Sequence, residues 1–123
     1  MIDNKQGSFP RPDIIMELTT AYWGSQAFFA THRLGIFERL SEGPASAEDL
    51  AEGIGCSFRH LELLLNTSVG QGLLEKNGDL FNNSVIAETY LVPGKPTFMG
   101  NAVNYGENLY NTWGRLEQCV KQG

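Results

Sequence analysis

The chain of 123 residues has few cysteines, few basic residues and no long apolar run. It has two cysteines and two histidines, and its 9 Lys and Arg residues are outnumbered by 14 Asp and Glu, so the formal net charge is −5. This shortage of positive charge argues against nucleic-acid and anionic-membrane partners, because both present phosphates that need a basic surface. No run has the length of a membrane-spanning helix, and the N-terminus lacks the apolar segment of a signal peptide. We therefore expect a cytoplasmic protein with no nucleic-acid or membrane partner.

The residues capable of chemistry are scattered along the chain. Cys56 and Cys119 lie far apart, which predicts two reduced, partly buried thiols. His32 and His60 have no Cys, Asp or Glu at the spacing of a metal site or a catalytic triad. One predicted helix has an acidic face that is expected to be solvated surface: Glu48, Asp49 and Glu52. The sequence therefore predicts no catalytic residue and no metal site in this chain.

Residues 46–81 have the clearest pattern. Ser46 stands three residues before Asp49, the spacing of a helix N-cap, and Gly53 and Gly55 are expected to end that helix. Ser57 is expected to cap a second helix. One buried face of that second helix follows from apolar residues at i, i+3, i+4 and i+8: Leu61, Leu64, Leu65 and Val69.

A hairpin is predicted after the second helix. Residues 73–76 and 80–81 flank Asn77-Gly78-Asp79, in which Asn-Gly is a strong hairpin signal because both residues tolerate the positive φ of a type I′ turn. Helix, turn, helix and a two-stranded wing make a winged-helix module. The expected fold class is therefore mainly α, a winged helix-turn-helix with a small β-hairpin wing.

A long helix is predicted to precede the winged helix. Residues 1–12 are polar and proline-containing and are expected to be a flexible arm, whereas residues 13–32 read as one helix. Its apolar residues occupy more than one side, and one small domain can cover only one side of a helix. We expect the other side to pack against a second copy of the chain. The predicted dimer-interface residues are Ile15, Leu18, Tyr22, Trp23 and Phe29.

Helical segments are also predicted on the C-terminal side of the wing. The cluster 82–84 is expected to cap a helix over 85–91, and the winged-helix dimerisation domain is expected to occupy residues 13–96. Residues 97–123 are expected to form a helical tail, with Thr97 as its cap and Gly106 as a possible kink. One stripe at i, i+4, i+7 and i+11 is expected on this tail: Leu109, Trp113, Leu116 and Val120.

The order of four segments resembles a known family. These are AFFATHRLGIFERL, SAEDLAEGIG, RHLELLLNTSVGQGLLEKNGDLFNNS and the W-x-x-L-x-x-x-V-x-x-G run from Trp113 to Gly123. Together they resemble the N-terminal dimerisation domain of the small-molecule O-methyltransferases that include caffeic acid and acetylserotonin methyltransferases. The resemblance covers about residues 22–123. It implies a homodimer, S-adenosylmethionine as cofactor of the full-length enzyme, and a catalytic methyltransferase domain as partner beyond residue 123.

The chain departs from the complete family pattern in one respect. It has no Gly-rich loop after a strand that could cradle the cofactor. The pairs Gly53-x-Gly55 and Gly70-x-Gly72 are interpreted as helix ends. The family's catalytic histidine also belongs to the other domain, so we expect no cofactor-binding or catalytic residue in this chain.

The resemblance also implies an acceptor-binding role for three residues of the tail. Val103, Asn104 and Leu109 match family positions that line the pocket of a small aromatic acceptor, and a surface or capping Asn104 is the alternative. Two other functions are kept open. A winged-helix transcription regulator would read DNA with Arg59 and His60 and touch phosphate with Lys76. A free-standing dimerisation module would have no ligand.

Overall fold

The computed structural model describes residues 9–123, so the prediction for residues 1–8 of the N-terminal arm lies outside the described residues. The described elements are α1 (Asp13–Arg33), α2 (Ile36–Leu40), β1 (Ala45–Ser46), α3 (Ala47–Ile54), α4 (Phe58–Gly70), β2 (Leu74–Asn77), β3 (Leu80–Asn83), α5 (Val85–Tyr90), α6 (Gly100–Asn108), α7 (Tyr110–Trp113) and α8 (Leu116–Gln122). The predicted fold class is confirmed: the chain is mainly helical and winged-helix-like, with one small antiparallel sheet.

Serine side chains begin three of these helices, as the sequence predicts. The Ser46 hydroxyl oxygen accepts from the Asp49 N–H at 3.1 Å, and the Ser57 and Ser84 hydroxyls accept in the same way at the starts of α4 and α5. Gly55 ends α3 with a φ of 83°, a conformation that costs glycine little. Gly53 lies inside α3, so the prediction that both glycines end the helix was wrong for Gly53.

The sheet differs from the predicted two-stranded wing in two ways. The strand order is β1-β3-β2, and the unpredicted β1 adds a third strand by pairing Ala45 with Phe81. In the wing, Asn77 pairs with Leu80, so the turn is Gly78-Asp79 and not Asn77-Gly78. Gly78 has a φ of 60°, and a positive φ at the first turn residue suits glycine. The predicted connection, Asn77-Gly78-Asp79, therefore contains the turn but is one residue too long, because Asn77 belongs to β2.

The core lies where α2, α4 and the sheet meet. Ile36 and Phe37 of α2 are fully buried, and Leu61 and Leu65 of α4 pack beside them with Phe81 of β3. The predicted face of α4 is confirmed, since Leu64 and Val69 also pack against this core while half-buried. Buried Ser68 lies on the same side of α4.

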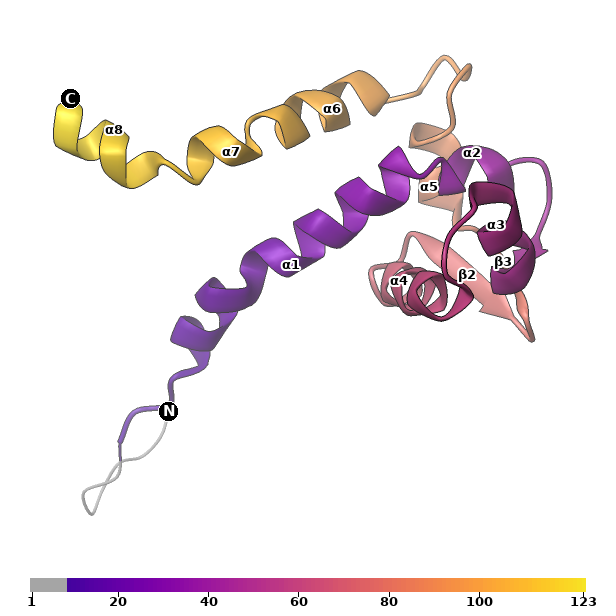
Figure 1. The fold of residues 1–123 in the computed structure, drawn as a ribbon, viewed down its shortest axis with the longest axis horizontal. Coiled ribbons are helices and arrows are strands. Elements are labelled where there is room, and N and C mark those ends of the chain that lie inside the picture. Colours follow the sequence, from indigo (N-terminus) through magenta and orange to yellow (C-terminus); the bar gives the residue numbers. More distant parts are fainter. Residues whose placement is uncertain (1–8) are drawn as a thin grey trace.

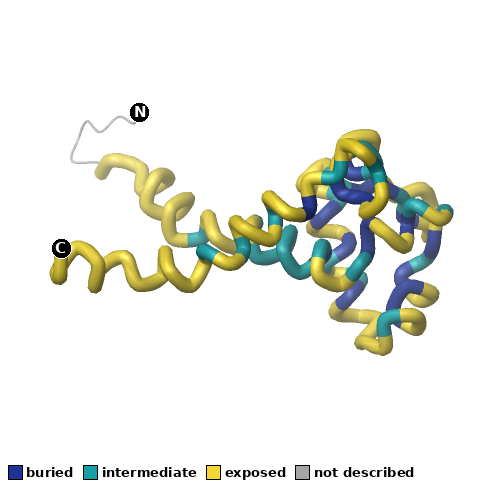
Figure 2. The backbone as a smooth tube through the Cα atoms, turned by 90° about the horizontal axis from the view of Figure 1, so that it is seen from above, coloured by how far each residue is buried: buried dark blue, intermediate teal, exposed yellow. Residues whose placement is uncertain are grey.

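Two helical arms leave this core on the same side. Figure 1 shows α1 running toward the winged-helix body and α6, α7 and α8 running away from it, with the start of α1 and the C-terminus far from the core. Figure 2 shows that the buried residues gather in the body while the outer parts of both arms are exposed. The chain therefore has one packed body and two largely uncovered arms.

The tail is less regular than the sequence predicts. It consists of three short helices, with breaks at Leu109 and at Gly114-Arg115, and Gly106 lies within α6. The four residues of the predicted stripe therefore do not share one helix: Leu109 lies at the first break, Trp113 ends α7, and Leu116 and Val120 lie in α8. Thr97 does not cap α6; its hydroxyl donates to the Thr89 carbonyl, and α6 begins after Met99.

Candidate interaction surface

The first half of α1 is an uncovered apolar surface. From Asp13 to Trp23 every side chain except Thr20 is exposed. Leu18 is 68% exposed and Trp23 is 61% exposed, and Ile15 and Tyr22 are exposed beside them. Phe29, the fifth predicted interface residue, is half-buried. Contiguous exposed apolar side chains of this kind mark an interaction surface.

The second half of α1 is held by the body. Gln71 donates to the Gly24 carbonyl at 2.9 Å, and the rings of Phe28 and Phe37 lie 6.4 Å apart. Fully buried Thr31 and Ser68 bring their hydroxyl oxygens to 3.2 Å where α1 crosses α4. The sequence interpretation missed these contacts, because a threonine or serine in a helix does not by itself indicate which helix it will meet.

The tail adds a second exposed apolar surface. Trp113 is 67% exposed, and Leu116 and Val120 of α8 are exposed as well. Leu109, the first residue of the predicted stripe, is half-buried at the break between α6 and α7. Cys119 of this tail and Cys56 of the body are both free and exposed, so the expectation of partly buried thiols was wrong.

The three predicted acceptor-side residues occupy different environments. Val103 is half-buried and packs against the hydrophobic core. Asn104 is exposed, and its Oδ1 atom lies 3.2 Å from Nε2 of His32 at the end of α1. One turn further along α6, Glu107 forms an ion pair with Arg33. Two consecutive residues of α1 thus hold α6 beside the body.

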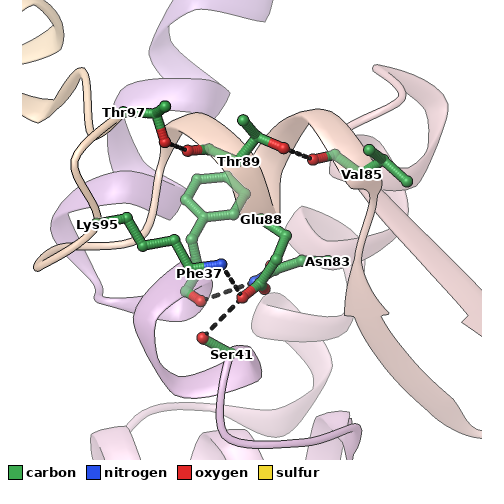
Figure 3. Close-up of polar contacts among 8 residues, drawn as sticks. All are labelled: Phe37, Ser41, Asn83, Val85, Glu88, Thr89, Lys95 and Thr97. Carbon is green, nitrogen blue, oxygen red and sulfur yellow. Dashed lines mark hydrogen bonds and ion pairs between the residues drawn. The ribbon is translucent and has the colours of Figure 1, made fainter.

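A polar cluster lies on the body near the start of the tail (Figure 3). The Glu88 carboxylate accepts from Asn83 at 2.8 Å, from Lys95 at 2.7 Å and from Ser41 at 2.9 Å. These hydrogen bonds, led by that from Asn83, lower the pKa of Glu88 from 4.5 to about 2, although partial burial acts in the opposite direction. The carboxylate therefore stays ionised at neutral pH. No sequence pattern indicated this cluster, since its members come from α2, β3, α5 and the following loop.

The face formed by α4 and the wing, which a winged-helix regulator would turn toward DNA, has mixed charge. Arg59 and His60 are exposed at the start of α4. Lys76 of the wing lies over the Phe81 ring, 5.1 Å from its centre. A hollow of about 200 Å³ between α4 and the wing is lined by this lysine and by three acidic residues, Glu48, Glu62 and Asp79. Such a surface offers a phosphate backbone little attraction.

Two further observations concern other classes of site. Within residues 9–123, no three His, Cys, Asp or Glu side chains come together in a way that could hold a metal ion. In the same described part of the chain, no helix is both long enough and apolar enough to cross a membrane.

A winged-helix-like body with two uncovered apolar arms is an architecture suited to association. The model of the O-methyltransferase dimerisation domain matches residues 16–93, and the chain belongs to this family. The resemblance of the four sequence segments is thereby confirmed.

Known relatives agree with this assignment. The chain is 36% identical over 92 residues to 3-hydroxy-5-methyl-1-naphthoate 3-O-methyltransferase of Streptomyces sahachiroi, covering 75% of this chain and 27% of that protein. It is 31% identical over 110 residues to the N,N-dimethyltransferase OxyT of Streptomyces rimosus, covering 89% and 32%. The structure of human N-acetylserotonin methyltransferase in complex with SAM superimposes with a TM-score of 0.80 and 27% identity, covering 96% of this chain and 36% of that one. The chain therefore spans about a third of the length of these relatives.

Proposed function

We propose that this chain is the dimerisation domain of an S-adenosylmethionine-dependent O-methyltransferase, and that two copies associate through α1 and the tail. The observation that carries the proposal is the uncovered apolar surface of α1 in a chain of this family. Helices with apolar residues on several sides need cover on several sides, and the body covers α1 only from Gly24 onward. A second copy with the same uncovered surface can supply the missing cover.

Sedimentation equilibrium of the chain at micromolar concentration tests this association. We expect two chains per particle, held by an apolar interface above roughly 2,000 Å² in total. Circular dichroism on the same sample reports whether the total helix content is that of the folded chain. A monomer in which the helices are fully formed would contradict the proposed dimer.

The acceptor is proposed to be small and aromatic. The naphthoate enzyme is named for an aromatic acid, and the human relative is named for N-acetylserotonin. OxyT is named as an N,N-dimethyltransferase, so relatives of this domain serve both oxygen and nitrogen acceptors. We propose Val103, Asn104 and Leu109 as acceptor-side residues. The contact with His32, which holds the Asn104 amide beside the end of α1, supports this role for Asn104.

The cofactor and the catalytic residues are proposed to belong to a catalytic methyltransferase domain that works with this chain. The relatives are about three to four times as long as the stretch that matches, which leaves room for such a domain in them. Calorimetric titration of the 123-residue chain with S-adenosylmethionine tests this division of labour, and no saturable heat is expected. Binding near micromolar concentration would place a cofactor site in this chain instead. A cytoplasmic location remains part of the proposal, supported by two free cysteines.

A further inference from the structure

The tail leaves the body through its root, the segment that joins α5 to α6, and farther along α6 is held by the contacts of Asn104 with His32 and of Glu107 with Arg33. Beyond α6, the residues of α7 and α8 are all exposed, so no apolar packing against the rest of residues 9–123 holds these two helices in place. We propose that Glu88 is a positioning residue that sets the direction of the tail relative to the winged-helix body, acting through Lys95.

The contacts around Glu88 connect four parts of the chain. Ser41 belongs to the end of α2, Asn83 to β3 and Glu88 to α5, whereas Lys95 belongs to the loop that leads into α6 (Figure 3). The loop is otherwise tied to α5 through the Thr89 carbonyl, which accepts from Thr97, and through Tyr90, whose carbonyl accepts from the Met99 N–H at 2.8 Å. Leu91 and Val92 at the start of the loop are buried. The Lys95 ion pair is the polar tie that connects the rest of the loop, through Glu88, to β3 and to the end of α2.

The polarity of the cluster requires a carboxylate at position 88. The Asn83 amide nitrogen donates both to the Phe37 carbonyl at 2.9 Å and to Glu88 at 2.8 Å. Because both partners are acceptors, the amide must present its nitrogen to them. A glutamine at position 88 would replace one accepting oxygen by an NH₂ group, which would face the Asn83 amide nitrogen or the Lys95 ammonium, both of which are donors.

A small rotation at the root becomes a large displacement at the far end. Gln118 lies 18 residues beyond Gly100, which corresponds to at most about 27 Å of helix, so a rotation of about 10° would move it by about 5 Å. The acceptor-side residues proposed above begin eight residues after Lys95, with Val103. If Glu88 sets the direction of the tail, it also sets where the proposed acceptor-side residues lie, and this consequence rests on the proposed function. The effect of Glu88 on the direction of the tail does not rest on it.

A distance measurement on the 123-residue chain tests directly whether Glu88 sets the direction of the tail. One spin label is attached to exposed Cys56 of the body, and the other to a cysteine introduced by Gln118→Cys in a Cys119→Ser background. Gln118 lies on the side of α8 opposite Leu116 and Val120, because successive residues are about 100° apart. Labelled protein is diluted with an excess of unlabelled Cys56→Ser/Cys119→Ser protein, so that a dimer contains a single labelled copy.

Glu88→Gln is expected to shift or broaden the distance distribution by about 5 Å, the displacement expected for the 10° rotation above. Lys95→Met should act in the same direction while leaving Glu88 bound to Asn83 and Ser41, and Lys95→Arg should keep the original distribution. Asp13→Asn, which breaks the exposed pair with Arg11, is the matched control and should change nothing.

Unchanged distributions in folded Glu88→Gln and Lys95→Met proteins would overturn the proposal. It would also fall if Arg33→Gln, which breaks the outer tie to Glu107, broadened the distribution while both root variants did not. A purely structural role for Glu88 would lower the unfolding temperature without changing the distance. Because the measurement involves no methyl transfer, its failure can be told apart from failure of the proposed function.

Discussion

Three donors from three other parts of the chain hold the Glu88 carboxylate. Because they stabilise its ionised form, the stability of the fold depends on pH through this residue. Its pKa is about 2 in the folded chain, against an ordinary value of 4.5. As pH falls, the unfolded chain takes up this proton before the folded chain does. The contribution of Glu88 to stability is therefore complete above pH 4.5 and is lost as pH falls through about 2.

Urea unfolding between pH 6 and pH 2 measures this loss. We expect the wild-type chain to lose more unfolding free energy over the range than Glu88→Gln, which has no proton to gain at this position. The side chain is 37% exposed, so solvent screens part of the effect. Glu48→Gln, which removes an exposed carboxylate on α3, is the control and should follow the wild-type curve. Parallel curves for wild type and Glu88→Gln would show that the three hydrogen bonds do not stabilise the ionised form.

Ser84 gives a second prediction at the scale of the residue. It is a buried cap whose hydroxyl accepts from the Ala87 N–H at 3.3 Å, at the start of α5. Ser84→Ala should lower the unfolding free energy by about 1–2 kcal/mol, because a buried N–H loses its acceptor. Ser25→Ala, at an exposed position within α1, should cost less than about 0.5 kcal/mol. Equal losses for the two variants in chemical unfolding would argue against the cap.

At the scale of the element, α1 changes character along its length. Its second half is held by Gln71, Phe37 and Ser68, whereas its first half is uncovered. The same helix can thus serve two cores, that of its own body and that of an interface. This division explains why its apolar residues do not keep to one side.

A pair of matched leucines tests the role of the uncovered half. Leu18 of α1 is 68% exposed, and Leu63 of α4 is 66% exposed. Leu18→Glu should raise the dimer dissociation constant about 100-fold or more, equivalent to about 3 kcal/mol, because a charge would be buried without a partner. Leu63→Glu should leave the dimer intact. Equal sedimentation behaviour of the two variants would place the interface elsewhere than on α1.

The wing shows how far an element can be predicted from its own residues. The presence of a hairpin after α4 was predicted correctly, but Asn77, expected in the connection, belongs to β2 and the turn is Gly78-Asp79. Pairing with β1 on the other side of β3 joins the hairpin to the stretch before α3. A two-residue strand has no periodicity of its own, so β1 could be recognised only through its partner.

At the scale of the whole molecule, the distribution of charge separates two classes of function. The segment from Ser57 to Phe81 has a formal charge of −1 with histidine neutral, and acidic side chains line the hollow between α4 and the wing. The family assignment agrees with an enzyme domain, and no finding favours a DNA-binding regulator.

Mobility-shift measurements with random duplex DNA test this distinction. We expect no shift at about 50 mM salt, where electrostatic binding to phosphates is strong. The double variant Glu62→Lys/Asp79→Lys should bind DNA weakly and in a salt-sensitive way. It is the positive control, because it shows that this face can reach DNA once its charge is positive. Binding by the wild-type chain that weakens steeply with added salt would instead favour the regulator.

The sequence by itself determined the features that depend on neighbours along the chain. Capping serines, the apolar face of α4, the hairpin and the long first helix follow from spacings of two to four residues, which act within a single element. The excess of apolar residues on α1 could also be counted without a structure. Local patterns of this kind predicted most of the elements and the excess of apolar side chains on α1, many of which the structure leaves exposed.

Only the tertiary structure decided how distant segments meet. The contact of Thr31 with Ser68, the hold of His32 on Asn104 and the four-part cluster at Glu88 join residues that share no periodicity. The breaks in the tail likewise interrupt a stripe that the sequence alone would continue. The physical reason is that such contacts depend on where whole elements pack, and packing of the body places β3, α2 and α5 around one carboxylate.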